Sequence, residues 1–522
     1  MSIFSVLEGK RTWWVEQGHV LDVLATIPDK SVQMVVTSPP YYSLRDYQTE
    51  PLIWGGDPEC EHQWNKYTKP GNTWGVPNKN TPGLIHKSVD TNTSFVGPRE
   101  QAFCVKCGAW RGDLGNEPLH DCGGWVTGNC CGSCYVCNMT RIFMEIWRVL
   151  RDDGVCFINI GDSYAHSGGS GSGEYQKRHK QFGKVVEPGT YQKPRTAPNG
   201  LKPKDLCGVP WRLALSLQAR GWYLRNDIVW HKNALPESVR DRCSVVHEYV
   251  FLLTKKPNYY FDQEAIREPY HPDSIKRKKY PTCKLGAEPG QPMVKGSSGA
   301  LGGGVNVQLS YKYRGANKTS IWRITNEPTK WDYCCNCKSI FVESGRKKIK
   351  RKEVDDGHGN KKTIRICPVC GSSTDWVKHY AIFPTALPSN CIKAGSSHKT
   401  CSACGAPYER ILEPSEEYAK YLGKGFHDHS NDKEQGMLQS KAPKLRADYV
   451  TKGWRPTCKC NAPAGGPSIV LDPFSGSGRS GLAALRLGRR YIGIELNEKY
   501  VEASRRLIEE DMPLFNIVAQ GV

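Results

Sequence analysis

The sequence has no long hydrophobic run. None of its apolar stretches approaches the roughly 18 residues of a membrane-spanning helix. Its first residues, MSIFSVLEGKRTWW, also lack the apolar core and the small-residue cleavage site of a signal peptide. These absences exclude a membrane-spanning protein and predict a soluble, cytoplasmic one.

Acidic residues are too few to balance the basic ones. Among 522 residues, 72 Lys and Arg stand against 52 Asp and Glu, which gives a formal charge of +20. An excess of this size favours a polyanionic partner. Nucleic acid is the partner we expect, ahead of an anionic membrane surface.

The chain has 22 cysteines, several of them in paired CxxC spacings. Because the cytosol keeps thiols reduced, this pattern predicts metal ligands and not disulfides. Sets of four ligands predict closed, structural zinc sites, about three in number. The three sets are Cys334, Cys337, Cys367 and Cys370; Cys401, Cys404, Cys458 and Cys460; and Cys60, His62, Cys104 and Cys107, where His62 is alternatively a surface histidine. A further group, Cys122, Cys131, Cys134 and Cys137, with Cys130 as an equal candidate, forms either a fourth site or unligated thiols.

Both ends of the chain and part of its middle alternate helices with buried strands. Near the amino terminus, an amphipathic segment and a Pro-Asp turn precede the run VQMVV at 32–36. Residues 141–164 and 206–233 each give a helix, a glycine-containing stop and a strand, and HEYVFLLTKK at 247–256 gives another strand. Residues 467–510 repeat strand, glycine-rich turn, helix, strand and helix. This alternation predicts an α/β fold with a doubly wound, mostly parallel sheet.

Polar and basic segments interrupt this pattern, so we expect a core divided by insertions. The predicted core segments are residues 1–55, 138–262, 377–399 and 463–522, with a mobile basic loop at 165–204. The predicted insertions are residues 56–137, 263–376 and 400–462, each with one of the cysteine sets. Residues 263–376 are also strongly basic, with IKRKKY and GRKKIKRKE. Zinc would let such polar segments fold without a core of their own.

Two short motifs follow predicted buried strands. TSPPYYSLRDY at 37–47 places Ser38 before two prolines, which have a fixed φ and donate no hydrogen bond, so the turn is a rigid set of acceptors. DPFSGSG at 472–478 is a glycine-rich turn that lets the backbone approach a ligand at a helix amino terminus. Glu495, at the end of the next strand, is placed to bond a ribose hydroxyl of a nucleotide-like cofactor. No Lys follows the turn in the GxxxxGK pattern, which argues against a P-loop.

In this order the two motifs resemble those of the amino-methyltransferases of DNA, in the permuted arrangement called the beta class. RVLRDDGVCFINIGDSY, residues 206–233 and FPTALPSNCI at 383–392 also match in that family's order. The resemblance implies a Rossmann-like methyltransferase sheet with zinc-stapled insertions, S-adenosyl-L-methionine as cofactor and double-stranded DNA as substrate. It further implies a prokaryotic or phage-encoded protein with a cognate restriction endonuclease as a possible partner, and target recognition by residues 263–376.

The resemblance also assigns residues to the site. The catalytic residues would be Ser38, Pro39, Pro40 and Tyr41. The cofactor would contact Asp472, Phe474, Ser475, Gly476, Gly478, Glu495, Asp162, Phe383 and Pro384. FPTALP departs from the more usual Pro-Thr-x-Lys-Pro, and Asp162 is equally suited to cap a helix or turn.

The acceptors of TSPPY suit the chemistry of an exocyclic amine, which is a poor nucleophile because it is conjugated to the base. Ser38 Oγ and the Pro39 carbonyl would accept hydrogen bonds from its N–H groups and free its lone pair for direct displacement at the sulfonium methyl, with the proton lost during or after transfer. Tyr41 would stack on the base once it has left the duplex.

The choice of base follows from the resemblance. Ser in the first position of (S/T/D)PP(Y/F) resembles the cytosine-N4 enzymes, so we expect methylation of cytosine N4, with adenine N6 as the alternative. Cytosine-C5 chemistry needs a cysteine that its family carries after a proline, and this chain has no Pro-Cys dipeptide. An alternative of another class is a zinc-dependent DNA-binding protein with an inactive methyltransferase core. The intact Ser38–Tyr41 motif, with Gly476, Gly478 and Glu495, argues against it.

Overall fold

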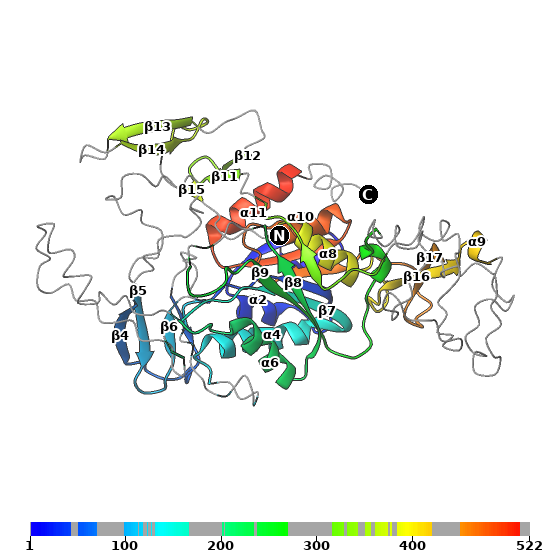
Figure 1. Cartoon of the computed structure of the whole chain (residues 1–522), viewed down its shortest axis with the longest axis horizontal. Coiled ribbons are helices and arrows are strands. Elements are labelled where there is room, and N and C mark those ends of the chain that lie inside the picture. Colours follow the sequence, from blue (N-terminus) through cyan, green and yellow to red (C-terminus); the bar gives the residue numbers. More distant parts are fainter. Residues whose placement is uncertain are drawn as a thin grey trace, which may run out of the picture. The chain divides into compact units, whose positions relative to one another are not determined.

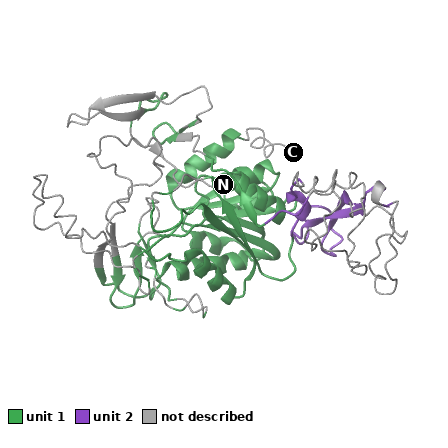
Figure 2. Ribbon diagram, viewed as in Figure 1, with its two compact units in different colours: residues 1–260, 320–398, 466–522 green, residues 261–319, 399–465 purple. Residues whose placement is uncertain are grey.

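The computed structural model of the chain is shown in Figure 1. It divides into two compact units, residues 1–260, 320–398 and 466–522 in the first and residues 261–319 and 399–465 in the second (Figure 2). The structure describes residues 2–42, 51–69, 99–112, 114–117, 119, 123, 127, 131–165, 201–202, 204–233, 237, 239–269, 316–327, 331–342, 350–355, 361–373, 376–377, 384–419 and 449–511. Phe383, Cys122, Cys130, the basic run IKRKKY, and residues 166–200 and 203 of the predicted loop at 165–204 lie outside the described residues.

The first unit is built on an eight-stranded sheet. Its strands lie in the order β1 (Trp13–Gln17), β19 (Arg490–Glu495), β18 (Ile469–Asp472), β2 (Val32–Thr37), β7 (Leu150–Ile160), β9 (His247–Thr254), β8 (Tyr223–His231) and β10 (Ile321–Arg323). Neighbouring strands are parallel except at β9, which is antiparallel to both β7 and β8. Every residue of β2 and β18 is buried, as expected for strands covered on both faces.

Helices cover both faces of this sheet (Figure 1). One layer holds α2 (Val20–Thr26), α4 (Tyr135–Val149) and α6 (Val209–Ala219), and the other holds α8 (Ala386–Gly395), α10 (Arg479–Arg486) and α11 (Glu498–Asp511). The short helix α1 (Ile3–Leu7) packs beside β1 and β19. The predicted α/β fold with a mostly parallel, doubly wound sheet is therefore confirmed.

Two predicted helix ends can be compared with the structure. The α6 helix ends at Ala219, and Gly221 follows with a φ of 102°, a left-handed conformation that glycine adopts at low cost. The α4 helix ends at Val149, four residues before the predicted stop at Asp153-Gly154. Strand β7 already begins at Leu150, and its register against β2 shifts between Val32 and Met34. The Asp-Gly pair thus lies within a strand.

The predicted recognition region also contributes to the sheet. Strand β10 lies within residues 263–376, and Trp322 pairs with Trp230 of β8. After β10, the same region forms a three-stranded sheet of β12 (Ser339–Val342), β11 (Trp331–Cys334) and β15 (Trp376–Val377), and a hairpin of β13 (Lys350–Asp355) and β14 (Lys361–Ile366).

The remaining elements lie in the amino-terminal insertion and in the second unit. The insertion is a four-stranded antiparallel sheet in the order β3 (Leu52–Trp54), β6 (Trp110–Gly112), β5 (Arg99–Cys104) and β4 (Trp64–Lys69). The second unit contains the 3-10 helix η2 (Gln263–Ile266), the hairpin of β16 (Tyr408–Pro414) and β17 (Tyr449–Pro456), and α9 (Glu416–Ala419). Within the part of the chain that the structure describes, no helix has the length and apolar character needed to cross a membrane.

Candidate functional site

The two sequence motifs meet at one edge of the sheet. Strands β2 and β18 are parallel neighbours, with Val35 opposite Leu471, so both end at the same edge. TSPPY begins with the last residue of β2, and DPFSGSG begins with the last residue of β18. The Thr37 hydroxyl donates to Asp472 Oδ1 at 2.6 Å, which joins the two motifs across 435 residues of sequence.

A cavity opens where the motifs meet. Together with its open mouth, the space measures about 960 Å³. Its wall combines both motifs with the loop after β1, the amino-terminal insertion and the end of β19. The lining residues are Gly18, His19, Val20, Ser38, Pro39, Pro40, Tyr41, Leu52, Trp54, Leu114, Pro473, Phe474, Ser475, Gly476, Ser477, Arg479, Ile494, Glu495, Leu496 and Tyr500.

Glycines let the DPFSGSG turn curl tightly into the start of α10. Gly476 and Gly478 have φ angles of 51° and 74°, and Gly478 is the N-cap of the helix. A Cβ on Gly478 would lie 2.9 Å from the Cβ of Ser504. Gly476, Gly478 and Gly481 have a GxGxxG spacing, and a Cβ on Gly481 would lie 2.7 Å from the Tyr491 ring. The third glycine thus permits close packing of helix on strand.

Glu495 lies at the cavity wall with its carboxylate oriented by the turn. Its Oε2 accepts the Gly476 N–H at 2.9 Å, and its Oε1 accepts the Asn497 N–H at 2.9 Å. Burial raises the pKa of Glu495 to about 7 in spite of these two donors. The structure therefore brings the predicted acidic residue to the glycine-rich turn, beside the space where a ligand would lie.

Asp472 lies beneath the cavity and is not one of its lining residues. The carboxylate is fully buried, which raises its pKa to about 6. It accepts hydrogen bonds from the hydroxyls of Thr37 and Ser480 and, at 3.1 Å, from the Phe474 N–H. These contacts fix the starting points of both motifs, so the geometry makes Asp472 an organising residue of the turn.

The Ser38–Tyr41 turn presents acceptors to the cavity. Ser38 Oγ donates to the Tyr41 hydroxyl at 3.3 Å, which leaves its lone pairs for a ligand. The Pro40 carbonyl accepts the Tyr135 hydroxyl at 2.6 Å. The Pro39 carbonyl accepts no hydrogen bond from a described residue.

A polar network behind the turn holds Tyr41. The Tyr41 hydroxyl lies 2.6 Å from Glu248 Oε2 and 3.0 Å from Asn159 Oδ1. Lys232 pairs with the other Glu248 oxygen at 2.7 Å. The ring packs so closely on Gly161 that a Cβ there would lie 2.9 Å from Tyr41 Cε2. Sequence reasoning missed Glu248 and Lys232, because only the antiparallel pairing of β8 with β9 brings them together.

A second polar cluster lies where α8 and α10 begin. Arg479 lines the cavity, and its Nη1 donates to Glu327 Oε2 and Thr385 Oγ1, each at 3.2 Å. Glu327 also accepts the Thr385 N–H and hydroxyl at 3.1 and 3.0 Å. The buried Nε of Arg479 has no partner among the described residues. Pro384 precedes this cluster but does not line the cavity.

Asp162 occupies the capping role that the sequence left open. Its Oδ1 accepts the N–H groups of Ser163 and Val209 at 2.9 and 3.1 Å, and its Oδ2 accepts that of Gly208 at 3.0 Å. The carboxylate thus closes the amino terminus of α6 and is not a lining residue. A direct cofactor contact by Asp162 stays a prediction.

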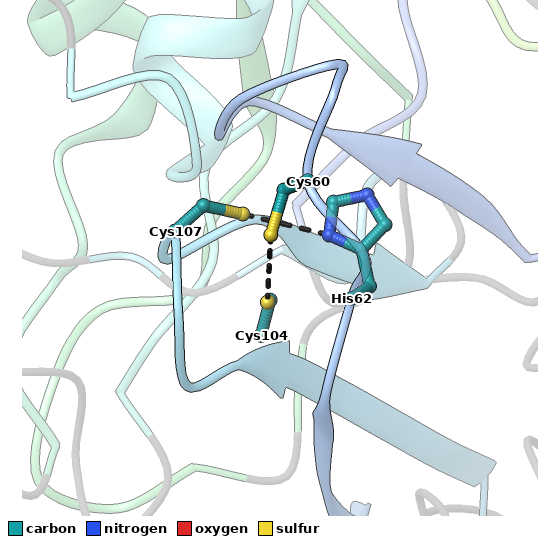
Figure 3. A group of neighbouring side chains, drawn as sticks. All are labelled: Cys60, His62, Cys104 and Cys107. Carbon is teal, nitrogen blue, oxygen red and sulfur yellow. Dashed lines mark hydrogen bonds between the residues drawn. The ribbon is translucent and has the colours of Figure 1, made fainter.

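The structure brings together each of the three predicted cysteine sets. The four ligand atoms of each set lie within 4.8 Å of one another. In the amino-terminal insertion, Cys60 and Cys104 point their sulfurs at each other, 3.8 Å apart, and His62 Nδ1 lies 3.5 Å from Cys107 Sγ (Figure 3). A tetrahedral zinc would place two sulfurs about 3.8 Å apart and a sulfur and a nitrogen about 3.5 Å apart. The donor set therefore fits zinc in both chemistry and spacing.

The other sets have the same character. Cys334 and Cys370 have sulfurs 3.6 Å apart, and those of Cys337 and Cys367 are 3.5 Å apart. In the second unit, the Cys404 N–H lowers the pKa of the Cys401 thiol to about 7, which favours the thiolate that a metal binds. From the undecided group, Cys131, Cys134 and Cys137 also have their sulfurs within 4.8 Å of one another.

Comparison with known proteins identifies the family. The DNA methylase family of N6 and N4 enzymes matches residues 32–400 and 464–506. The type II methyltransferase M.SmaI of Serratia marcescens is 45% identical over 375 residues, which covers 72% of this chain and 74% of the relative. M.Cfr9I of Citrobacter freundii is 36% identical over 253 residues, and the match spans 48% of this chain and only 57% of that relative.

A solved structure, the PvuII DNA methyltransferase described as cytosine-N4-specific, covers 98% of the chain and 96% of its own length. Its identity is 14% and its TM-score 0.37. The chain belongs to the N6 and N4 DNA methylases.

Proposed function

We propose that the protein transfers the methyl group of S-adenosyl-L-methionine to the exocyclic N4 of cytosine in duplex DNA, by base flipping and direct displacement. One observation carries the proposal: Ser38, Pro39 and Pro40 share a single cavity with Phe474, Gly476 and Glu495. The acceptors for an amine and the turn for a nucleotide-like cofactor therefore face the same space.

The cavity wall suits a cofactor with a ribose, an aromatic base and a charged amino-acid end. Glu495 would accept the ribose hydroxyls, and Phe474 and Gly476 would contact the atoms between ribose and sulfur. Arg479 adds a cation whose buried Nε has no partner among the described residues, and it is placed to receive a carboxylate. When bound, S-adenosyl-L-methionine supplies an electrophilic sulfonium methyl.

The Ser38–Tyr41 turn would prepare the amine for attack. Ser38 Oγ and the Pro39 carbonyl accept hydrogen bonds from its N–H groups and draw the lone pair out of conjugation with the ring. The lone pair then forms the bond to the methyl carbon, S-adenosylhomocysteine leaves, and the amine loses one proton to solvent during or after the transfer. Their rigidity matters because the nitrogen must approach the methyl carbon in line, at near contact distance. Tyr41, anchored through Glu248, would present one side of its ring to the flipped base.

Cytosine N4 is preferred to adenine N6 because Ser and not Asp precedes the prolines. Adenine N6 is the alternative. Both amines need the same acceptors, so the geometry of the turn does not separate them.

DNA would be held by the basic segments of residues 263–376, which include the strands β13 and β14. Phosphate contacts from Lys and Arg fix the duplex, and base-edge contacts select the sequence. The relatives named as type II methyltransferases make a cognate restriction endonuclease the expected partner. The three cysteine sets would each hold a structural zinc ion with four protein ligands.

The proposal is tested by incubating the full chain with methyl-labelled S-adenosyl-L-methionine and DNA of mixed sequence. The DNA is then digested to nucleosides, which are separated and identified by mass spectrometry. We expect label in N4-methyldeoxycytidine. Label in N6-methyldeoxyadenosine would establish the alternative, and loss of signal in Ser38→Ala and Pro39→Ala would assign it to this site.

The same experiment tests the alternative of an inactive core. A chain that binds DNA but transfers no label to any base, with cofactor at saturating concentration, would be a zinc-dependent DNA-binding protein. Sequencing of DNA from expressing cells with modified-base detection would then identify the methylated sequence or show that none exists.

A further inference from the structure

We propose that Cys131, Cys134 and Cys137 bind a further zinc ion at the start of α4, and that this ion holds Tyr135 against the Pro40 carbonyl. The site would be separate from the three sets of four ligands. Its second part rests on the proposed function, because Pro40 belongs to the turn assigned to catalysis.

The three sulfurs converge although the residues differ in exposure. Cys131 is exposed, whereas Cys134 and Cys137 are almost completely buried. All three Sγ atoms nevertheless lie within 4.8 Å of one another, as in the three larger sets. Three thiolates around one zinc would be about 3.8 Å apart, a spacing that lies within this limit. The exposed Cys131 gives an ion access from solvent.

Two groups at the start of α4 would stabilise the sulfurs once they are bound to a metal. Cys134 is the N-cap of α4, a helix of 15 residues, and Cys137 lies in its first turn. The positive end of a helix stabilises negative charge there. The Cys131 N–H donates to Cys137 Sγ at 3.2 Å, a bond that supports a metal-bound sulfur. Three protein ligands leave the fourth zinc position for water or a further ligand.

The site is one residue from a contact with the catalytic turn. Tyr135, fully buried, follows Cys134 and donates its hydroxyl to the Pro40 carbonyl at 2.6 Å. Its ring also meets that of Tyr42 edge-on, with centroids 5.6 Å apart. An ion that fixes the first turn of α4 therefore fixes Tyr135, and through it the position of Pro40 in the cavity wall.

Metal content of the full chain tests the site directly. The protein is purified without chelator, and zinc is measured per chain by mass spectrometry. We expect Cys131→Ser, a change at an exposed position, to lose one equivalent relative to the wild type. Cys243→Ser removes an exposed thiol that belongs to none of the clusters in the described residues, and it should lose none. An unchanged zinc content in Cys131→Ser would overturn the proposal. A disulfide between two of the three cysteines, detected after the protein is denatured and its zinc chelated, would also overturn it.

Tyr135→Phe tests the link to the turn. It removes one hydroxyl and no metal ligand, so the zinc content should equal that of the wild type. We expect the turnover number to fall about 5-fold, the effect of one hydrogen bond, with cofactor affinity unchanged. Wild-type turnover in Tyr135→Phe would refute the link. Absence of methyl transfer in the wild type would instead refute the proposed function, and the zinc count would still decide the metal site.

Discussion

The hydrogen bond from Thr37 to Asp472 should contribute more to stability at high pH than at low pH. Thr37→Val removes the hydroxyl and keeps the shape of the side chain. The lost bond is 2.6 Å long, fully buried and directed at a carboxylate. Hydrogen bonds to charged groups contribute about 1.5–3 kcal/mol, and those between neutral groups about 1 kcal/mol.

The pKa of Asp472 sets the direction of the effect. Burial raises it to about 6, from an ordinary value near 4, so folding with the ionised carboxylate costs roughly 3 kcal/mol. For an acid with a raised pKa, this cost is fully present above pH 6 and disappears as the pH falls towards 4. Loss of the Thr37 donor raises the pKa further. The variant should therefore lose about 2 kcal/mol at pH 8 and about 1 kcal/mol at pH 5.

Urea unfolding of wild type and variant at the two pH values measures this difference. Thr26→Val is the matched control, because the Thr26 hydroxyl donates to a neutral backbone carbonyl, that of Val23, at 2.8 Å. Its effect should be the same at pH 5 and pH 8. An equal loss for Thr37→Val at both pH values would show that Asp472 does not carry the charge assigned to it.

Three further perturbations address the cavity and the metal sites. Gly161→Ala places a methyl group 2.9 Å from the Tyr41 ring. We therefore expect turnover, measured by single-turnover assay, to fall about 10-fold, and cofactor affinity, measured by calorimetry, to stay the same. Glu495→Gln should weaken cofactor binding about 10-fold. Because the pKa of Glu495 is about 7, the wild-type affinity for the cofactor should fall as the pH drops below 7, and the affinity of the variant should not. Chelation of zinc should lower the urea midpoint of the wild type, and Cys337→Ser should show part of this loss before chelator is added. A urea midpoint that chelation leaves unchanged would contradict a structural role of the metal.

The sequence predicted the parts of the site that depend on local pattern. Apolar runs located β2, β7 and β18, and the alternation with helices predicted parallel pairing. Parallel strands end at one edge, so Ser38 and Gly476 were expected to meet there, and the cavity contains both. The cysteine spacing likewise predicted which sulfurs would converge.

Features that depend on pairing between distant segments could not be read in this way. Strand β9 is an apolar run like the parallel strands of the sheet, and nothing in the sequence shows that it runs in the opposite direction. That direction places Glu248 next to Lys232 and Tyr41. The contact of Arg479 with Glu327 similarly depends on the fold of residues 320–398. Asp472 was expected at the cofactor, and its burial and hydrogen bonds show that it organises the turn, while a direct cofactor contact stays a prediction.

Strand direction also determines where the later part of the predicted recognition region starts. Residues after β10 leave the sheet at the carboxyl edge, because β10 is parallel to β8 and, through β9, to β7. Glu327 shows the consequence, since it reaches Arg479 at the cavity only four residues after Arg323. The segment from β11 to β15, with Cys334 and its partner ligands, therefore starts from the edge that holds the cavity. Basic-to-neutral changes in β13 and β14 should accordingly weaken DNA binding and reduce its salt dependence, with no effect on cofactor affinity.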